Sequence, residues 1–537
     1  MRNAGRIAFI VFAAWLAGCG LTGRPVLHGD AREYILQTQA IALRGSLAID
    51  PIRAAEYWNR TNPYSLELGE TRPASWPLNE SAQAGGGFGA LYPDRFGEWR
   101  FAHFWAYSAV VAPLYGFLHL VAPKAEYAVF RIVNTLFLLL PFLLAWRGGG
   151  GGRLLIVMIL AAFSPLIPYT DWAHPELFCL GLVMASFQLA RGPRGRWFAP
   201  ALLGLAATQN PPILLFFPLL LLRALSGSGR PAWRQVLLAF GAGALIGLLP
   251  VFYARHYFEA WNIIQAVDQA KTSYATLARA VHFFFSPLVG AVWIFPTCFL
   301  FLPVSVRRSN AVFTAASLLS VFAAAWASSA TANFNAGQVG ALRYAVWALA
   351  PLWFLVFEAT REPLDGRARK ILFPAAVALN VLLILAFKYE RLPRKDIRLV
   401  AGCRRATPPV AALVRGLHYP DDIEVLVENI VGHELPGPRQ FNGVYVWNLA
   451  PDRSLWIVSR AAVERGLVLA RPMAPGLRLD AHPSGSLDVE YDGGTAILRI
   501  HPAAGWAHHP VWGDYLFAWS TRALPPTGRE PPWLVIR

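Results

Sequence analysis

The sequence predicts a mainly α-helical membrane protein, a polytopic transmembrane bundle of about 11 spans over residues 1–390 with a small β-rich domain over residues 391–537. Of the 537 residues, 55% are hydrophobic and 15% are charged, whereas soluble domains carry about 25% charged residues. Apolar runs of roughly 15–22 residues, each near the length that crosses a bilayer, recur from Ile7 to Phe387. From about Lys388 the composition becomes polar and proline-rich.

The first apolar run, Ile7–Leu21, follows Arg2 and Arg6. Its end, Leu16-Ala17-Gly18-Cys19, is similar to a lipoprotein cleavage box, because a basic region and an apolar stretch precede the cysteine. The alternative is an uncleaved first membrane helix that contains a cysteine. Both readings tether the residues that follow to the outer membrane surface.

Residues 22–126 are predicted to form a long outer loop with interfacial helices. The helical spacing of apolar residues from Ile35 and the capping preference of aspartate predict a helix that begins at Asp30. The apolar segment His103–Ala122 is long enough to cross, but a crossing there would invert every later loop. We therefore expect it to lie along the outer surface, or to dip in and return.

Ten further apolar runs are predicted spans. Arginine-rich loops alternate between them with loops nearly free of Lys and Arg, so the positive-inside rule places the N-terminus in the cytoplasm and the C-terminal domain outside it. The predicted location is the bacterial inner membrane. The runs are Tyr127–Trp146, Arg153–Thr170, His174–Ala190, Trp197–Gln209, Pro211–Leu225, Gln235–Ala254, Ser286–Val304, Val312–Ala330, Arg343–Ala359 and Ile371–Phe387.

The C-terminal part has short alternating apolar runs separated by turn residues, the pattern of β-strands. We predict strands at Ile423–Val427, Gly443–Trp447, Ser454–Val458, Leu487–Tyr491 and Thr495–Ile500.

Composition also argues against several classes of function. A net charge of +16 would suggest nucleic acid as the partner of a soluble protein. Here most arginines lie between apolar runs, where they orient spans and face anionic lipid, so we expect membrane lipid and not nucleic acid as a partner. The four cysteines form no CxxC or Cys/His spacing, so neither a disulfide framework nor a zinc site is expected.

Polar groups from distant segments are expected to converge on the outer face. Carboxylates near arginines beside an apolar groove suit a lipid-linked phosphate, because guanidinium groups hold phosphate and a carboxylate can take a proton from an acceptor hydroxyl. The candidate catalytic residues are Asp30, Glu33 and Glu176, and the candidate substrate-binding residues are Arg100, His103, Asp171, His174, Arg255, Lys271, Arg343 and Tyr344.

These segments, in their order, resemble the GT-C superfamily of membrane glycosyltransferases, which includes the protein O-mannosyltransferases and the lipid A aminoarabinose transferases. The resemblance covers roughly residues 1–390. It rests on Gly29-Asp30 with Glu33-Tyr34, the Gln39–Leu47 stretch, His103 with Ala112-Pro113-Leu114-Tyr115, Pro175-Glu176, and Gly340-Ala341-Leu342-Arg343-Tyr344 with Ala350-Pro351-Leu352.

The resemblance implies a multi-pass glycosyltransferase that moves a sugar from a polyprenyl-phosphate donor to an envelope glycan or lipid outside the cytoplasm. Asp30 would be the base or would organise the site, Glu176 would match a second acidic position, and Arg343 would match a basic residue for the lipid phosphate. Some members use a divalent metal; the sequence establishes neither a metal nor another cofactor. The chain departs from the family where Ala31-Arg32 follow the first aspartate.

Two other classes of function stay open. A transporter or flippase of lipid-linked or envelope precursors would also be polytopic, but such proteins usually show paired halves and charges at mid-membrane depth. A non-catalytic envelope assembly protein could be built around the β-rich domain. Individual residues also have plain alternatives: Asp30 as a helix cap, Glu33 and Glu176 as first-turn acids, and Arg343 as a snorkelling anchor.

Overall fold

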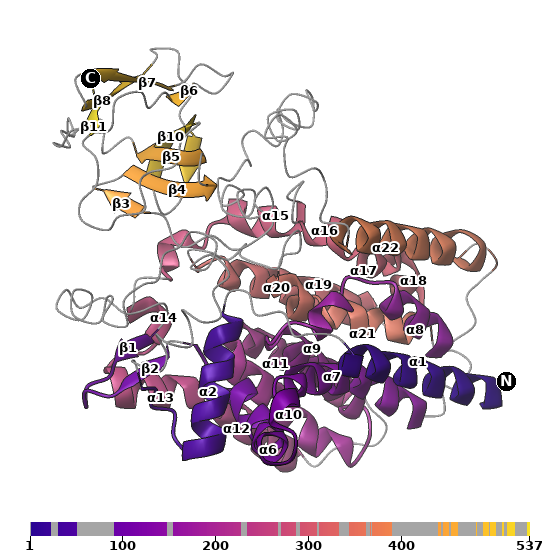
Figure 1. Ribbon diagram of the computed structural model, residues 1–537. Coiled ribbons are helices and arrows are strands. Elements are labelled where there is room, and N and C mark those ends of the chain that lie inside the picture. Colours follow the sequence, from indigo (N-terminus) through magenta and orange to yellow (C-terminus); the bar gives the residue numbers. More distant parts are fainter. Residues whose placement is uncertain are drawn as a thin grey trace. The chain divides into compact units, whose positions relative to one another are not determined.

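The computed structural model describes helices and a short hairpin in the N-terminal part of the chain and strands in the C-terminal part (Figure 1). The chain divides into two compact units, one of residues 1–61 and 73–392 and the other of residues 62–72 and 393–537. The described residues are 2–22, 30–50, 91–101, 103–147, 154–226, 233–266, 270–285, 290–308, 311–331, 343–360, 366, 368–388, 439–441, 444–450, 453–459, 479–480, 487–492, 495–500, 507–509, 513–520 and 534–536.

The first unit is built of helices, which confirms the mainly α-helical class. Its longer helices are α1 (Arg2–Thr22), α2 (Ala31–Arg44), α6 (Ala106–Val121), α7 (Ala128–Arg147), α8 (Leu154–Ala162), α9 (Glu176–Leu189), α10 (Gly195–Gln209), α11 (Phe217–Leu225), α12 (Trp233–Gly247), α13 (Leu249–Phe258), α15 (Leu277–Phe285), α19 (Ala311–Ser328), α21 (Ala350–Ala359) and α22 (Phe373–Lys388). Its shorter helices are α14 (Ile263–Ala266), α16 (Ala291–Ile294), α17 (Pro296–Leu300), α18 (Leu302–Arg308) and α20 (Arg343–Ala348). Four 3₁₀ helices and one π-helix also occur among the described residues: η1 (Pro123–Ala125), η2 (Pro168–Thr170), η3 (Pro211–Phe216), η4 (Thr272–Tyr274) and the π-helix η5 (Ala368–Leu372).

Three helical stretches among the described residues are long and apolar enough to cross a bilayer, which supports association with a membrane. They are Ala128–Arg147, Trp233–Phe258 and Ala311–Ser328. Six of the other predicted spans overlap shorter apolar helices, and the runs at Arg153–Thr170 and Trp197–Gln209 overlap α8 and α10. The predicted number of about 11 is therefore not established by helix length.

Prolines divide several of the predicted spans. The run predicted at Arg343–Ala359 is split at Leu349, just before Pro351 in the first turn of α21. The run predicted at Ser286–Val304 is interrupted in the same way at Phe295, before Pro296. A proline lacks the N–H that would continue the preceding helix but suits the first turn of the next one, so helical pieces follow each other with a break.

Helix α9 lies at the centre of the helical unit. Its residues from Glu176 to Phe187 are all buried, and it packs against α7, α10, α20 and α21. Gly181 lets α7 approach closely, because a Cβ atom there would overlap the Phe137 carbonyl. The first residue of α9 is therefore an acid held inside the protein.

Glycines also set the contact between α10 and α12, which lie side by side (Figure 1). A Cβ atom at Gly243 would overlap the Pro200 carbonyl oxygen, and one at Gly204 would overlap that of Gly243. Small residues at such positions let helices of membrane proteins pack backbone to backbone.

Replacing Gly243 by alanine should therefore destabilise the protein, by about 1–3 kcal/mol as for other overpacked sites. The matched control is Gly241→Ala in the same helix, where no atom lies within 4 Å of the added Cβ. That change should be neutral or stabilising, since alanine is the better helix former. Thermal unfolding of the detergent-purified variants measures the difference, and equal midpoints would contradict the proposed close contact.

The described strands of the C-terminal part form one sheet in the order β11-β8-β7-β6-β10-β5-β4-β3, with β9 paired to β10. All its pairs are antiparallel except the parallel pair β11–β8. Four predicted strand segments fall on β4, β5, β7 and β8, and Ile423–Val427 lies outside the described residues. The strands are β3 (Arg439–Phe441), β4 (Val444–Ala450), β5 (Arg453–Ser459), β6 (Leu479–Asp480), β7 (Leu487–Asp492), β8 (Thr495–Ile500), β9 (Ala507–His509), β10 (Gly513–Ser520) and β11 (Leu534–Ile536).

Candidate functional site

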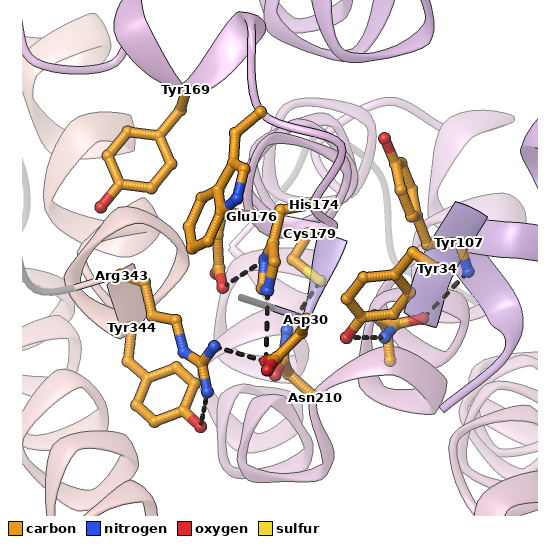
Figure 2. Close-up of polar contacts among 12 residues, drawn as sticks. Asp30, Tyr34, Tyr107, Tyr169, His174, Glu176, Cys179, Asn210, Arg343 and Tyr344 are labelled. Atoms are coloured by element: carbon orange, nitrogen blue, oxygen red, sulfur yellow. Dashed lines mark hydrogen bonds and ion pairs between the residues drawn. The ribbon is translucent and has the colours of Figure 1, made fainter. Parts of the chain in front are cut away.

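The carboxylate of Asp30 is the meeting point of three cationic or ionisable side chains, two of which, Arg343 and His174, are seen in Figure 2. Its Oδ2 lies 2.5 Å from Nη1 of Arg343, 3.3 Å from Nε2 of His103 and 3.5 Å from Nε2 of His174. The four residues come from four segments: the start of α2, the segment before α6, the segment before α9, and the start of α20. The fold thus joins residues that are 313 positions apart.

Each of the two histidines is paired with a glutamate on its other ring nitrogen. Nδ1 of His174 lies 3.1 Å from Oε1 of Glu176, and Nδ1 of His103 is in close contact with Oε2 of Glu33. Both glutamate side chains are buried. Two Glu–His pairs therefore converge on one aspartate, and we call these five residues with Arg343 the Asp30 cluster.

The local sequence leaves the Asp30 side chain available to this cluster. Asp30 stands at the N-cap of α2, and its carbonyl oxygen accepts the N–H groups of Glu33 and Tyr34 at 3.0 Å and 3.1 Å. Its carboxylate makes no capping hydrogen bond. Capping of α2 is thus not the role of this carboxylate, and its partners are the side chains of the cluster.

Aromatic rings hold His174 in place. The indole of Trp172 stacks on the imidazole at 4.0 Å between centroids, and Tyr34 meets it edge-on at 5.0 Å. Gln209 in turn donates from Nε2 to the Tyr34 hydroxyl at 3.1 Å and accepts the backbone N–H of Tyr107 at 2.9 Å. Such second contacts fix the orientation of a reactive side chain.

These supporting residues were missed by the sequence analysis as members of the site. Tyr34 carried a usable signal, because it lies four residues after Asp30 and so one helical turn further along the same face. Trp172 is two residues from His174, and Gln209 is a polar residue between two apolar runs. Neither position by itself indicates the contact that the fold creates.

Arg343 is held on both sides of its guanidinium. Nη1 binds Asp30, and Nη2 donates to the Tyr344 hydroxyl at 3.1 Å. The guanidinium carbon lies 4.9 Å from the centre of the Tyr344 ring. Both residues were predicted for the site, and Tyr344 reaches it through Arg343.

Charge decides the protonation of Asp30 and His103. Burial alone would raise the pKa of Asp30, but the Arg343 guanidinium and His103 outweigh it and hold that pKa well below the ordinary 3.8. Burial alone would lower the pKa of His103, but the carboxylates of Glu33 and Asp30 outweigh it and raise that pKa well above the ordinary 6.5. At neutral pH Asp30 is an anion and His103 an imidazolium.

The raised pKa of His103 predicts a loss of stability at alkaline pH. The stabilisation from the charged His103 is fully present below its ordinary pKa of 6.5 and is lost as the pH rises through the higher pKa of the folded protein. The thermal midpoint of the detergent-purified protein should fall in this window, on scanning from about pH 6 to about pH 10. His103→Gln should remove this part of the pH dependence; an unchanged profile would show that His103 is not charged in the fold.

Two predicted site residues form ion pairs of their own, apart from the Asp30 cluster. Asp171 pairs with the buried Arg131, whose Nη2 lies 2.6 Å from the carboxylate. Arg100 pairs with Asp94 at 2.7 Å and lies over the ring of Tyr257 at 3.9 Å. Arg100 belongs to the hairpin of β1 (Leu91–Pro93) and β2 (Trp99–Phe101), and its contacts anchor that hairpin on α13.

The other two predicted residues are exposed. Arg255 donates to the backbone carbonyl of Glu259 at 2.8 Å and lies over Trp261. Lys271 lies near Tyr274, with its ammonium 5.8 Å from the ring centre. Neither makes a contact with the Asp30 cluster that the described residues record.

Carboxylates and imidazoles are the ligands that divalent metals bind in proteins. In the cluster these groups are paired with one another, and within the described part of the chain no group of three or more of them has the arrangement of a metal site.

Comparison with protein-family models gives no match for this chain. Neither the curated proteins nor the solved structures contain a match.

Proposed function

We propose that the protein is a membrane glycosyltransferase that moves a sugar from a polyprenyl-phosphate donor to a glycan or lipid acceptor of the cell envelope. The observation that carries the proposal is the pairing of Asp30 with Arg343 at 2.5 Å, inside a cluster that also holds two Glu–His pairs. A general base and a phosphate-binding cation are the two groups that this reaction needs side by side.

In the proposed reaction the acceptor oxygen attacks the anomeric carbon of the donor directly. Asp30 takes the proton of the acceptor hydroxyl as the new C–O bond forms. The bond between the anomeric carbon and the phosphate oxygen breaks, and its electron pair leaves with the polyprenyl phosphate. Arg343 releases Asp30 and turns to stabilise the negative charge on this leaving group.

The proposal includes the wider arrangement predicted from sequence. About 11 spans would carry the site at the outer membrane surface, the donor's lipid chain would lie between helices, and the β-rich part would be outside the cytoplasm. Helix α6 would lie along the outer surface, with its two tyrosines buried in the protein and His119 as its partly exposed polar side chain.

Transport is the competing function, and one observation favours it. Ionisable side chains buried among apolar helices also form the proton and ion paths of transporters. A transporter would move a lipid-linked precursor without changing it, whereas a transferase converts the donor into polyprenyl phosphate. The chemical fate of the donor separates the two functions.

The proposal is tested with the purified full-length protein in detergent. The probe is a panel of undecaprenyl-phosphate-linked hexoses, pentoses and their amino derivatives, with the envelope fraction of a deletion strain as the acceptor. Release of undecaprenyl phosphate together with a new glycan mass in the acceptor supports the transferase. Movement of intact donor across proteoliposomes, with no donor consumed, would instead show transport.

A further inference from the structure

Two further ionisable groups, His174 and Glu176, follow one another inward from Asp30. The Asp30 carboxylate lies 3.5 Å from Nε2 of His174, and Nδ1 of the same ring lies 3.1 Å from Glu176. Figure 2 shows His174 in contact with both carboxylates, that of Asp30 and that of Glu176. The proposed reaction needs Asp30 but leaves His174 and Glu176 without a stated task.

The surroundings of Glu176 are unusual for an acid. Its side chain is 2% exposed, and its Oε2 has no hydrogen-bond partner in the described part of the protein. A buried carboxylate normally has its oxygens hydrogen-bonded, since a buried charge without partners is costly. The Oε2 atom of Glu176 is therefore a buried acceptor position that no described side chain fills.

The two histidines differ in what they can do. His103 carries a proton on both ring nitrogens at neutral pH, because the Glu33 and Asp30 carboxylates raise its pKa. An imidazolium can donate to both carboxylates but cannot accept a further proton. His174 is held between Trp172 and Tyr34, with Nε2 3.5 Å from the Asp30 carboxylate and Nδ1 3.1 Å from that of Glu176. Neither ring nitrogen makes a hydrogen bond among the described residues, so both contacts have to tighten before a proton can pass through the ring.

We infer that His174 and Glu176 form a proton relay behind Asp30, so that the proton taken from the acceptor hydroxyl ends on Glu176. The inference rests on the proposed function and names two further residues for the same reaction. His174 would be the relay and Glu176 the final proton acceptor, while Asp30 would stay the group that touches the acceptor.

The protons balance in three steps. Asp30 takes the hydroxyl proton of the acceptor as the glycosidic bond forms. Nε2 of His174 takes that proton from Asp30, and Nδ1 of His174 gives its own proton to Oε1 of Glu176. Asp30 is again an anion, His174 is in its other tautomer, and Glu176 carries the proton. After product release the proton returns through His174 to Asp30 and from there to water, which restores the first tautomer.

The relay answers a difficulty of the Asp30 site. The pKa of Asp30 lies well below its ordinary value, because burial is outweighed by Arg343 and His103. A carboxylate with a lowered pKa is stable as an anion and holds a proton poorly. The proton taken from the acceptor hydroxyl therefore needs a second group that accepts it. The titratable and charged groups that face the relay are Asp30 at the N-cap of α2, Tyr34 of α2, His103 before α6, Tyr169 of η2, Cys179 of α9 and Arg343 of α20.

The test uses Glu176→Gln and His174→Gln in the full-length protein, with the undecaprenyl-phosphate sugar that the wild type consumes. Each variant should lower kcat on the order of 10–100-fold while the donor KM stays within about threefold. The double variant should be no slower than the slower single variant, since the two residues act in one path. The solvent deuterium isotope effect on kcat should fall in each variant, a change that a merely structural role would not produce.

If His174→Gln does not fold, Glu176→Gln alone tests the relay, because the amide keeps the shape of the acid. If Glu176→Gln turns over like the wild type, with the same solvent isotope effect, while Asp30→Asn is inactive, the relay is wrong and the transferase stands. If the wild type consumes no donor of the panel, the transferase proposal fails, and the relay fails with it. A drop in kcat with an unchanged isotope effect would reduce Glu176 to a structural role and would also overturn the relay.

Discussion

Asp30→Asn is expected to lower kcat for sugar transfer by about 10²–10⁴-fold while the protein stays folded. Asparagine has nearly the same shape as aspartate and can still contact Arg343 and His174, but its amide cannot take a proton from the acceptor hydroxyl. Release of undecaprenyl phosphate from the donor measures the loss. The thermal midpoint of the same preparation reports on folding.

The matched control is Glu98→Gln, which also turns a carboxylate into an amide. Glu98 is 55% exposed and contacts Arg100 in the β1–β2 hairpin, so its replacement should leave kcat unchanged. Full activity of a folded Asp30→Asn variant would contradict the catalytic role of the cluster. It would favour the non-catalytic assembly protein that the sequence also allows.

The helices could be predicted from sequence because apolar runs need helices in a membrane. Lipid offers no partner for a free N–H or C=O group, so a long apolar segment must bond its backbone internally. The run at Tyr127–Trp146 indeed corresponds to α7. Where a proline such as Pro296 or Pro351 falls inside a run, the length of the run overestimates the length of the helix.

Six members of the site were predicted because acids and histidines stand where apolar runs begin. Asp30, His174 and Arg343 each flank a predicted helix, and helices that meet side by side bring such ends together. The sequence could not separate them from Asp171 and Arg100, which have the same chemistry and position. The structure separates them by their ion-pair partners. Asp171 pairs with Arg131 of α7, and Arg100 pairs with Asp94 of its own hairpin.

The pairing itself could not be predicted either. An arginine near the end of an apolar run is usually an interface anchor, and nothing around Arg343 in the sequence points to a residue 313 positions earlier. The guanidinium reaches Asp30 through the packing of the fold, in which α20 lies against α9, α19 and α21. The same holds for Trp172, whose stacking on His174 depends on the turn before α9.

Replacing Arg343 by methionine should lower kcat by about 10²–10³-fold, since a group that stabilises the leaving phosphate is lost. It should also move the acid limb of the pH profile upward. Arg343 is the largest of the effects that lower the pKa of Asp30, and without it that pKa rises. The anionic base is then lost at a higher pH as the solution is made acidic.

Arg343→Met should also be less stable to unfolding than the wild type. The stabilisation from the paired Asp30 is present above the ordinary pKa of 3.8 and is lost as the pH falls through the lower pKa of the folded protein. Without Arg343 this stabilisation is reduced throughout that range, and a carboxylate is left with fewer partners in a largely buried place. Thermal midpoints measured at mildly acidic and at neutral pH give the difference.

Two further variants separate the charge of Arg343 from its shape. Arg343→Lys keeps the charge, so the acid limb should stay near that of the wild type, but lysine lacks the planar fork that binds Asp30 and Tyr344 together. Its donor KM should therefore rise. Tyr344→Phe removes one hydrogen bond and should have the smallest effect of the three. An acid limb that moves equally in Arg343→Lys and Arg343→Met would show that the charge on Arg343 does not control Asp30.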